Sequence, residues 1–491
     1  MSGWSGSTAL VFEDRSYART ELDDLAAGLA ADLAVRGVGP GDRVALMSSN
    51  RPEFVIATLA IWRLGAAVVL ISPAWKVAEV AHALALTSPR YGVGDCAVLG
   101  ELLPTRSLDE PIAPKADDPG VFSVGGGPNV FSVGGPPAAG PRGTDPAADA
   151  VLVFSSGTTG MPKAVRHTHA SLEAAVEQWR EVLGLDGSDR LQIATPPSHI
   201  LGLLNILTAL RVGAGMRLHR RFDLKTMLDC IQNERITVEM AVAPIALALA
   251  SHPDLESYDL SSLRYIMWGA TPVTASVAET VTRRTGVGWL PAYGASELPV
   301  IACNPRAEPR LDSVGRAAPG VRIRVVSVDS GEVVGTGETG EIQCRADSLM
   351  SGYLPSEATA SAFHDGWYRT GDVGHVDAEG WIRLTDRLKE MIKVRGFQVA
   401  PAEIEAVLHG HPDIQDCAVF GVDGADGEAI VAAVRTDGDL TEDQVVAFVG
   451  DRLATYKKPR RVVFVPEIPR LPSGKVLRRV LKERHGHPSD Q

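Results

Sequence analysis

The chain has 491 residues, of which 45% are hydrophobic and 22% are charged, fractions typical of a globular protein with room for several compact units. Its 48 lysines and arginines face 60 aspartates and glutamates, and the net charge of −12 gives no electrostatic support for binding nucleic acid. The five cysteines are scattered and form no Cys-x-x-Cys pair, so we expect neither a disulfide framework nor a cysteine metal cluster.

The sequence carries no pattern of export or membrane insertion. Its first residues include acidic side chains and lack the apolar core of a signal peptide. No apolar run approaches the roughly 18–20 residues that a membrane span needs. We therefore expect a cytoplasmic protein without a membrane span.

The first part of the chain has the pattern of a parallel α/β unit. Leucines at positions 22, 25, 29 and 33 have helical spacing, and Gly37 follows as a stop signal. Residues 43–47, 52–64 and 67–71 then read as strand, helix and strand, an order that predicts a parallel sheet. Residues 100–148 are rich in proline and glycine and contain FSVGG twice, which predicts a long connecting loop.

The stretch SSGTTGMPKAV, residues 155–165, combines glycines, hydroxyls and one lysine. A short apolar run precedes it at 150–154 and a helical pattern ending at Gly184 follows, so we predict a strand-to-helix loop. Glycines let backbone N–H groups approach a ligand, while hydroxyls and Lys163 add donors and positive charge. We interpret the stretch as a phosphate-binding loop; a flexible surface loop is the alternative. Its spacing fits neither the Walker loop nor the Rossmann fingerprint.

The pattern changes twice in the second half of the chain. Residues 314–382 show short alternating runs with glycine-rich turns, which predict antiparallel strands or a small barrel. A charged stretch begins at Asp386, and the residues after it contain a helix, two strands and a second helix. This last segment, of about 100 residues, is long enough for a separate α+β domain. Near its end, Lys475 lies on a loop rich in proline and glycine.

Two further stretches place an acid among hydroxyls or glycines, YGASE at 293–297 and YRTGDVG at 368–374. Each alone would be interpreted as a turn. Together with the phosphate-binding loop and four other stretches, however, they resemble the adenylate-forming (AMP-binding) superfamily, of the acyl-CoA synthetase and aryl-CoA ligase type. The other stretches are PPSHILGL (196–203), TGETGEI (336–342), DRLKEMIKVRGFQVAPAEIE (386–405) and LPSGKVLRR (471–479). The resemblance extends along nearly the whole chain and is densest from 151 to 480.

This resemblance implies an α/β fold with two domains. Residues 1–386 would form a large N-terminal AMP-binding domain of two α/β sheets plus a small β-barrel. Residues 387–491 would form a mobile C-terminal α+β domain. The chain departs from the usual pattern at Ala164, where glycine is commonest, and at Ser296, where threonine is commonest. Serine keeps the hydroxyl group of threonine, and alanine in place of glycine reduces backbone freedom without removing a chemical group. Neither departure therefore threatens the implied chemistry.

The implied activity is that of an ATP-dependent acid–thiol ligase. A small-molecule carboxylic acid would attack the α-phosphate of ATP, with Mg²⁺ as cofactor, to give an acyl-adenylate and pyrophosphate. The thiol of coenzyme A would then displace AMP. Such chemistry depends on positioning and on charge neutralisation more than on a protein nucleophile. We expect the enzyme to be a monomer or a homodimer.

The resemblance also assigns roles to residues. Lys475 would stabilise the transition state of adenylation, Glu297 would hold Mg²⁺, His199 would flank the substrate carboxylate, and Lys393 would serve the second half-reaction. Asp372 would accept hydrogen bonds from the ribose hydroxyls. The ATP-binding residues would be Ser155, Ser156, Gly157, Thr158, Thr159, Gly160, Lys163, Gly269, Ala270, Thr271, Tyr293, Gly294, Ser296, Asp372 and Arg387.

The acid pocket is expected to be apolar. Its predicted lining is His199, Leu203, Val242, Trp268, Gly294, Leu298, Pro299 and Val300. None of these is a lysine or arginine that would bind a second carboxylate, and residues 191–210 contain no acid that would pair with a substrate ammonium group. We therefore expect a hydrophobic aryl, cyclic or medium-chain monocarboxylic acid. His199 as an ordinary core histidine is the alternative.

The acceptor is the less defined half of the prediction. By resemblance, Lys389 would be the hinge between the domains, and Lys393, Arg395 and Gly396 would border the path of CoA. A stand-alone amide synthetase or a loader of acyl-carrier protein would keep the same ATP-binding residues and remains an alternative. A non-catalytic nucleotide-binding regulator is a third possibility, against which the joint presence of Lys475, Glu297 and Asp372 argues.

Overall fold

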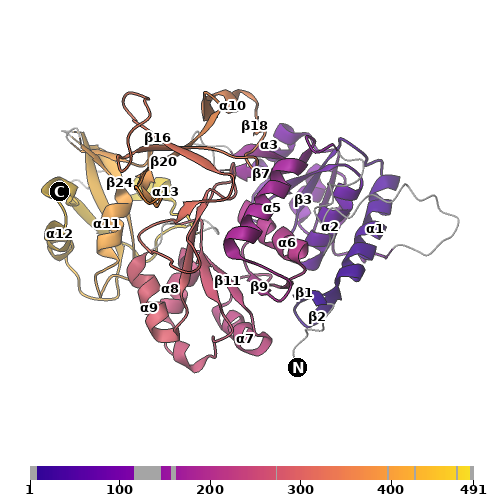
Figure 1. The fold of residues 1–491 in the computed structure, drawn as a ribbon, viewed down its shortest axis with the longest axis horizontal. Helices are drawn as coiled ribbons and strands as arrows, with labels where there is room; N and C mark the ends of the chain where they lie inside the picture. Colours follow the sequence, from indigo (N-terminus) through magenta and orange to yellow (C-terminus); the bar gives the residue numbers. More distant parts are fainter. Residues whose placement is uncertain are drawn as a thin grey trace.

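The computed structural model describes residues 8–114, 145–155, 162–271, 274–394, 397–424, 427–470 and 474–486. Its strands form four sheets, and the chain passes through them broadly in sequence order (Figure 1). Among the described residues, no helix is both long enough and apolar enough to cross a bilayer.

The first sheet has seven strands in the order β18-β8-β7-β4-β3-β5-β6. Strands β3 to β7 pair in parallel, whereas β8 is antiparallel to both β7 and β18. The strands are β3 (Arg43–Met47), β4 (Ala67–Ile71), β5 (Tyr91–Gly94), β6 (Thr105–Ser107), β7 (Asp149–Ser155), β8 (Lys163–Thr168) and β18 (Gly352–Leu354). The helices between them are α2 (Pro52–Arg63), α3 (Val77–Thr87) and α4 (Ala97–Leu102).

The second sheet has nine strands in the order β15-β14-β13-β12-β11-β9-β10-β1-β2. These are β1 (Thr8–Phe12), β2 (Arg15–Ala18), β9 (Arg190–Ile193), β10 (Gly215–Leu218), β11 (Val238–Ala241), β12 (Tyr265–Trp268), β13 (Trp289–Tyr293), β14 (Ala302–Cys303) and β15 (Arg316–Ala317). Its helices are α1 (Arg19–Val35), α5 (His169–Leu183), α6 (Ile200–Val212), α7 (Leu224–Glu234), α8 (Ala243–Ser251), η1 (Leu255–Ser257) and α9 (Ala275–Thr285).

The period-two alternation of the strands explains the layers. Val44 and Leu46 of β3 pack with α1, α2, α5 and α6 in a core shared by the two large sheets. Ala45 and Met47 point to the opposite face, which α3 and α4 cover. The second sheet is likewise covered on its outer face by α7, α8 and α9. Strands with helices on both faces must be apolar on both faces, which is why their sequences are continuous hydrophobic runs.

The third sheet is antiparallel, as the alternating runs predict. Its order is β16-β17-β20-β19, with β21 also paired to β20, so the described strands form an antiparallel sheet, the first of the two alternatives predicted for residues 314–382. The strands are β16 (Arg322–Val326), β17 (Gly340–Arg345), β19 (Phe363–His364), β20 (Trp367–Val376) and β21 (Ile382–Arg387), and α10 (Glu357–Ala362) precedes β19.

The C-terminal segment has its own sheet and its own apolar cores. The strands are β22 (Ile392–Val394), β23 (Phe397–Val399), β24 (Asp416–Gly424), β25 (Gly427–Arg435) and β26 (Arg461–Phe464). The helices are α11 (Pro401–Leu408), α12 (Glu442–Gly450), η2 (Thr455–Lys457) and α13 (Arg478–His485). In Figure 1 this segment, in yellow, lies beside α8 and α9. The domain boundary at 386/387 stays a prediction, and it falls at the end of β21.

Two predictions about loops differ from the structure. The phosphate-binding loop does not lead into a helix: β7 is followed by the antiparallel strand β8, and α5 begins only at His169. In KAVRHT, Ala164, Val165 and His167 are buried, and the consecutive Ala164 and Val165 pack into cores on opposite faces of the sheet, as residues of a strand do. The predicted loop 100–148 contains β6 and the end of α4, while residues 115–144 lie outside the described part of the chain.

Candidate active site

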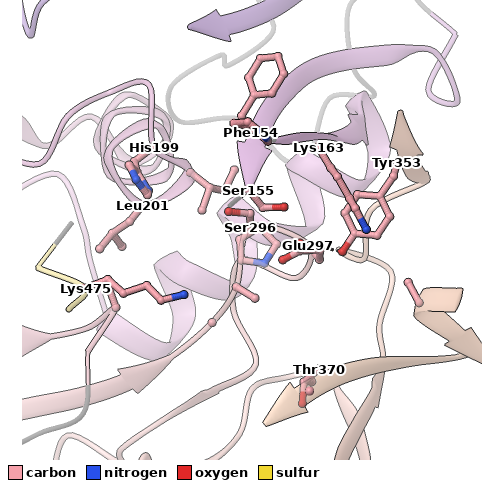
Figure 2. Close-up of a pocket in the computed structure, with 18 of the residues that line it drawn as sticks. Phe154, Ser155, Lys163, His199, Leu201, Ser296, Glu297, Tyr353, Thr370 and Lys475 are labelled. Atoms are coloured by element: carbon pink, nitrogen blue, oxygen red, sulfur yellow. Dashed lines mark hydrogen bonds between the residues drawn. The ribbon is translucent and has the colours of Figure 1, made fainter. Parts of the chain in front are cut away.

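A cavity of about 930 Å³ lies where the first three sheets and the C-terminal segment meet. The ends of β7, β12 and β13 supply much of its wall, the position at which parallel α/β sheets bind ligands. Predicted site residues in the lining are Ser155, Lys163, His199, Gly269, Ala270, Tyr293, Gly294, Ser296, Glu297, Pro299, Arg387, Lys389 and Lys475. Figure 2 shows Lys163 and Glu297 near each other on one side of this space and Lys475 on the other side.

Glu297 is held in place by a tyrosine from another sheet. Its carboxylate oxygen Oε1 accepts a hydrogen bond of 2.8 Å from the hydroxyl of Tyr353 on β18. The Lys163 ammonium lies 5.6 Å from the centre of the same tyrosine ring. The preceding residue is also fixed, because buried His167 contacts the Ser296 carbonyl oxygen at 2.7 Å through Nε2. A cation and a carboxylate are thereby positioned on one wall of the cavity (Figure 2).

The turn after β13 requires glycine at position 294. A Cβ added there would lie 2.1 Å from the carbonyl oxygen of Pro299, so any other residue would displace the backbone. This close approach folds the chain back on itself between Gly294 and Pro299, and Ser296 and Glu297 lie within the turn. It therefore brings the hydroxyl and the carboxylate of YGASE to the cavity wall.

Asp372 lies just beneath the cavity wall and is 5% exposed. Its Oδ2 accepts a hydrogen bond of 2.5 Å from the Tyr293 hydroxyl, and its Oδ1 lies 2.8 Å from Nε of Arg387. Burial raises the pKa of Asp372, and the positive charge of Arg387 opposes that rise. Tyr293 and Arg387 themselves line the cavity, so the three predicted residues form one connected group at its edge.

Lys475 reaches the cavity from the C-terminal segment, and in Figure 2 its side chain extends toward Ser296. Burial lowers the pKa of its ammonium group, and the nearby positive charges of Arg387 and Lys389 lower it further. A lysine among other cations favours an anionic ligand, because the anion relieves the repulsion among them.

His199 is the N-cap residue of α6, and its side chain lines the cavity near Ile200 and Leu201. Burial lowers the pKa of its imidazole, which keeps the ring neutral near pH 7. The walls around it are apolar, with Trp179 and Pro196 among the lining residues. The surroundings of His199 therefore suit an uncharged, hydrophobic group.

Five residues predicted for the acid pocket belong instead to the protein core. Leu203, Val242, Trp268, Leu298 and Val300 are at most 7% exposed and are absent from the described lining. The alternation along β12 directs Trp268 toward α8 and α9, where it packs on Trp289 with ring centres 5.0 Å apart. Thr271 is also turned from the cavity, since its hydroxyl accepts a hydrogen bond of 3.0 Å from the Trp268 indole.

The predicted CoA residues do not face the cavity as far as they are described. Lys393 is exposed, and its backbone N–H donates to Glu428 at 2.8 Å. Arg395 and Gly396 lie outside the described residues, as do Ser156, Gly157, Thr158, Thr159 and Gly160 of the phosphate-binding loop. The roles predicted for these residues stay predictions.

The cavity also contains residues that sequence reasoning missed. They are Trp75, Glu79, Phe154, Glu341, Tyr353, Tyr368, Arg369 and Thr370, together with one face of α10. Tyr353 follows a glycine in SGYLP, but nothing in that pattern indicates its contact with Glu297, 56 residues away. Three of the missed residues, Tyr368, Arg369 and Thr370, lie inside the quoted YRTGDVG stretch, of which only the acid had been assigned a role.

Comparison with known proteins identifies the family. The family model described as AMP-binding enzyme matches residues 2–354, and the AMP-binding enzyme C-terminal domain matches residues 403–475. The 4-coumarate–CoA ligase 1 of Oryza sativa subsp. japonica is 36% identical over 515 residues, covering 95% of this chain and 87% of the relative. The 4-coumarate–CoA ligase 1 of Solanum tuberosum is 35% identical and covers 96% and 89%.

Solved structures with the same fold cover nearly the whole chain. ATP-bound MatB from Rhodopseudomonas palustris has a TM-score of 0.87 at 27% identity, covering 98% of this chain and 96% of that one. The amide bond synthetase McbA from Marinactinospora thermotolerans has a TM-score of 0.86 at 30% identity, covering 98% and 97%. The predicted family and fold class are confirmed: the chain belongs to the AMP-binding enzyme family, the adenylate-forming enzymes of the acyl-CoA synthetase and aryl-CoA ligase type.

Proposed function

We propose that the protein is an AMP-forming acid–CoA ligase that activates a hydrophobic carboxylic acid. The observation that carries the proposal is that Lys475, from the C-terminal segment, enters the cavity lined by Lys163 and Glu297. Two cations and a carboxylate around one space match what an adenylation reaction needs. The 4-coumarate–CoA ligases among the relatives support CoA as the acceptor.

In the first half-reaction, a carboxylate oxygen of the acid attacks the α-phosphorus of ATP. The bond between that phosphorus and the bridging oxygen breaks, and pyrophosphate leaves. Lys475 would neutralise the charge that builds up between the carboxylate and the α-phosphate, while Lys163 would balance the leaving pyrophosphate. Asp372 would bind the ribose hydroxyls once they compete with Tyr293 for its Oδ2.

Mg²⁺ fits the donor set of this site. Oε1 of Glu297 is engaged by Tyr353, which leaves the second oxygen of a cavity-lining carboxylate for a cation. The described residues contain no group of three or more acidic, histidine or cysteine side chains that would hold a metal alone. Mg²⁺ is commonly bound through one carboxylate plus substrate phosphates. When bound, it would neutralise phosphate charge and favour departure of pyrophosphate.

The acid would bind beside His199. The neutral imidazole and the apolar residues Ile200, Leu201 and Pro299 offer no charge to a second carboxylate or an ammonium group in this part of the described lining. Burying an unpaired charge there would cost several kcal/mol, on the order of what separates good from poor substrates. We therefore propose an aryl, cyclic or medium-chain monocarboxylic acid.

In the second half-reaction, the sulfur of CoA attacks the acyl carbon, the bond to the AMP oxygen breaks, and the thiol proton passes to solvent. With Lys475 in the cavity and Lys393 exposed, the described arrangement suits the first half-reaction. The second would require the C-terminal domain to turn about Lys389 and present Lys393 and Gly396. Such a turn is a hinge motion in which few residues change their backbone angles.

Transfer to an amine is the second candidate. The likeness to an amide bond synthetase, at 30% identity over 98% of this chain, favours it specifically. Both functions share the adenylation step and differ only in the nucleophile that attacks the acyl carbon. Loading of an acyl-carrier protein is a further alternative to CoA as the acceptor. Its phosphopantetheine thiol would attack the acyl carbon as the CoA thiol does.

A panel of carboxylic acids tests the proposal. Pyrophosphate release would be followed for aryl, alicyclic, medium-chain, amino and dicarboxylic acids, with CoA, an amine mixture or holo-carrier protein as acceptor. We expect sustained release with a hydrophobic monocarboxylic acid and CoA, and a thioester product by mass spectrometry. Sustained turnover with an amine instead of CoA would establish the alternative. Absence of acid-dependent release with every acceptor would overturn both.

A further inference from the structure

The loop that carries Lys475 is held by one arginine of its own domain. Nη1 of Arg470 donates a hydrogen bond of 2.9 Å to the carbonyl oxygen of Gly474, the residue directly before Lys475. Nη2 of the same guanidinium donates to Oδ1 of Asp416 at 2.7 Å, and Nε donates to Oδ2 at 3.3 Å. The guanidinium therefore bridges a carboxylate and the backbone of the lysine loop.

Asp416 provides a rigid anchor for this bridge. It is the first residue of β24, which pairs with β25 along its whole length, and Asp416 itself lies opposite Arg435. The carboxylate is 12% exposed, and the Nε2 atom of His409 lies 4.0 Å from it. The Arg470 side chain is 17% exposed, so solvent screens this ion pair only weakly.

The other side of the loop touches the N-terminal domain. Gly474 has φ of +83°, and a Cβ placed on it would lie 2.8 Å from Cδ of Pro244 and 3.4 Å from Cγ2 of Thr271. The peptide before Lys475 is therefore confined between Arg470 on one side and the start of α8 on the other. A bridge between Arg470 and Val476 closes the base of the loop.

We propose that Arg470 is a positioning residue for the first half-reaction, fixing the backbone from which Lys475 reaches the cavity. The inference rests on the proposed function, in which Lys475 acts in adenylation. Without Arg470, the loop would keep its lysine but lose the anchor that sets the direction of the side chain. A misplacement of about 1 Å at a reacting centre can cost on the order of 100-fold in rate.

Arginine suits this task better than lysine. Its planar fork binds the two oxygens of Asp416 and the Gly474 carbonyl at the same time, whereas an ammonium group is a single point charge on a flexible stem. Arg470→Lys should therefore keep the charge but restore only part of the positioning. Arg470→Ala removes both the charge and the contacts that position the loop.

The test separates the two half-reactions in the intact enzyme. Adenylation is measured by ATP–pyrophosphate exchange with the best acid of the panel, and the second step by consumption of the chemically prepared acyl-adenylate with its acceptor. Lys457→Ala is the matched control, since it removes another cation of this domain, one that pairs with Glu403 at 2.6 Å and not with Asp416 or Gly474. Melting temperatures are recorded for every variant.

We expect Arg470→Ala to lower kcat for exchange about 10- to 100-fold, with KM for acid and ATP within threefold and the second step within threefold. Arg470→Lys should recover part of the loss, and Lys457→Ala should retain wild-type exchange. Wild-type exchange in Arg470→Ala, or an equal loss of both steps with a lower melting temperature, would overturn the positioning role. Wild-type exchange in Lys475→Ala would instead overturn the proposed function, so the two failures are distinguishable.

Discussion

Glu239 provides a quantitative prediction for stability, because it is an acid buried in an apolar layer. It lies on β11, is 1% exposed, and faces helices α7 and α8. Gln192 donates a hydrogen bond of 2.5 Å to its Oε2, whereas Oε1 has no partner in the described part of the chain. Burial raises the pKa of Glu239 to about 8, although the bond from Gln192 opposes the rise.

The sign of the pH dependence follows from proton linkage. Below about pH 4.5, the carboxyl is protonated in both the folded and the unfolded chain, so its titration costs nothing. Between about pH 4.5 and 8, only the unfolded chain releases the proton, and the free energy of unfolding falls as pH rises. At pH 7 the loss is about 1.4 × 2.5, or roughly 3.5 kcal/mol, and it levels off above about pH 8.

Glu239→Gln should remove this loss, since the amide has nearly the same shape and does not ionise. The variant should be more stable than the wild type by roughly 3.5 kcal/mol at pH 7 and by less than about 1 kcal/mol at pH 5. Urea unfolding of both proteins at pH 5, 6, 7 and 8 measures the difference for the transition that includes the second sheet. A difference that stays constant across this range would refute the reasoning, because it would show that Glu239 does not titrate with folding.

Three further predictions concern the site. Asp372→Ala should raise the KM for ATP at least about 10-fold, because hydrogen bonds to a charged acceptor are worth roughly 1.5–3 kcal/mol each; a KM within twofold of wild type would contradict ribose binding. Tyr353→Phe should raise the Mg²⁺ concentration for half-maximal exchange about 10-fold, because Glu297 loses its orienting bond, and an unchanged Mg²⁺ dependence would count against that role. Lys389→Pro fixes the backbone angle φ of residue 389 and should leave ATP–pyrophosphate exchange active while thioester formation collapses. If both steps kept the same fraction of their wild-type rates, the hinge role of Lys389 would be contradicted.

The alternating and helical periods of the sequence predict much of the fold. The predicted elements at 43–47, 52–64 and 67–71 correspond to β3, α2 and β4, and β3 and β4 pair in parallel as expected. These elements are buried on both sides, so nearly all their residues must be apolar, and this continuous apolar pattern can be recognised in the sequence. The β8 strand was missed because the helical pattern after His169 is longer and stronger than the six residues before it.

The motifs locate the site along the chain but not the direction of each side chain. Three predicted residues lie in the quoted motifs YGASE, SSGTTGMPKAV and LPSGKVLRR, and all three line the cavity: Glu297, Lys163 and Lys475. Trp268 belongs to the predicted lining of the acid pocket, yet the alternation of β12 directs its side chain into the core against α8 and α9. Contacts such as that of Tyr353 with Glu297 depend on how separate sheets meet, which no local pattern specifies.

Oxygen transfer tests the central claim most directly, namely that an acyl-adenylate forms in this cavity. The best acid of the panel is labelled with ¹⁸O in both carboxylate oxygens and incubated with ATP, Mg²⁺ and CoA, and the nucleotide product is examined by mass spectrometry. Attack of the carboxylate on the α-phosphorus followed by release of the acyl group leaves one ¹⁸O in AMP. The account predicts AMP carrying one label. ADP as the nucleotide product, with the label in inorganic phosphate, would contradict it, because the acid would then have attacked the γ-phosphorus.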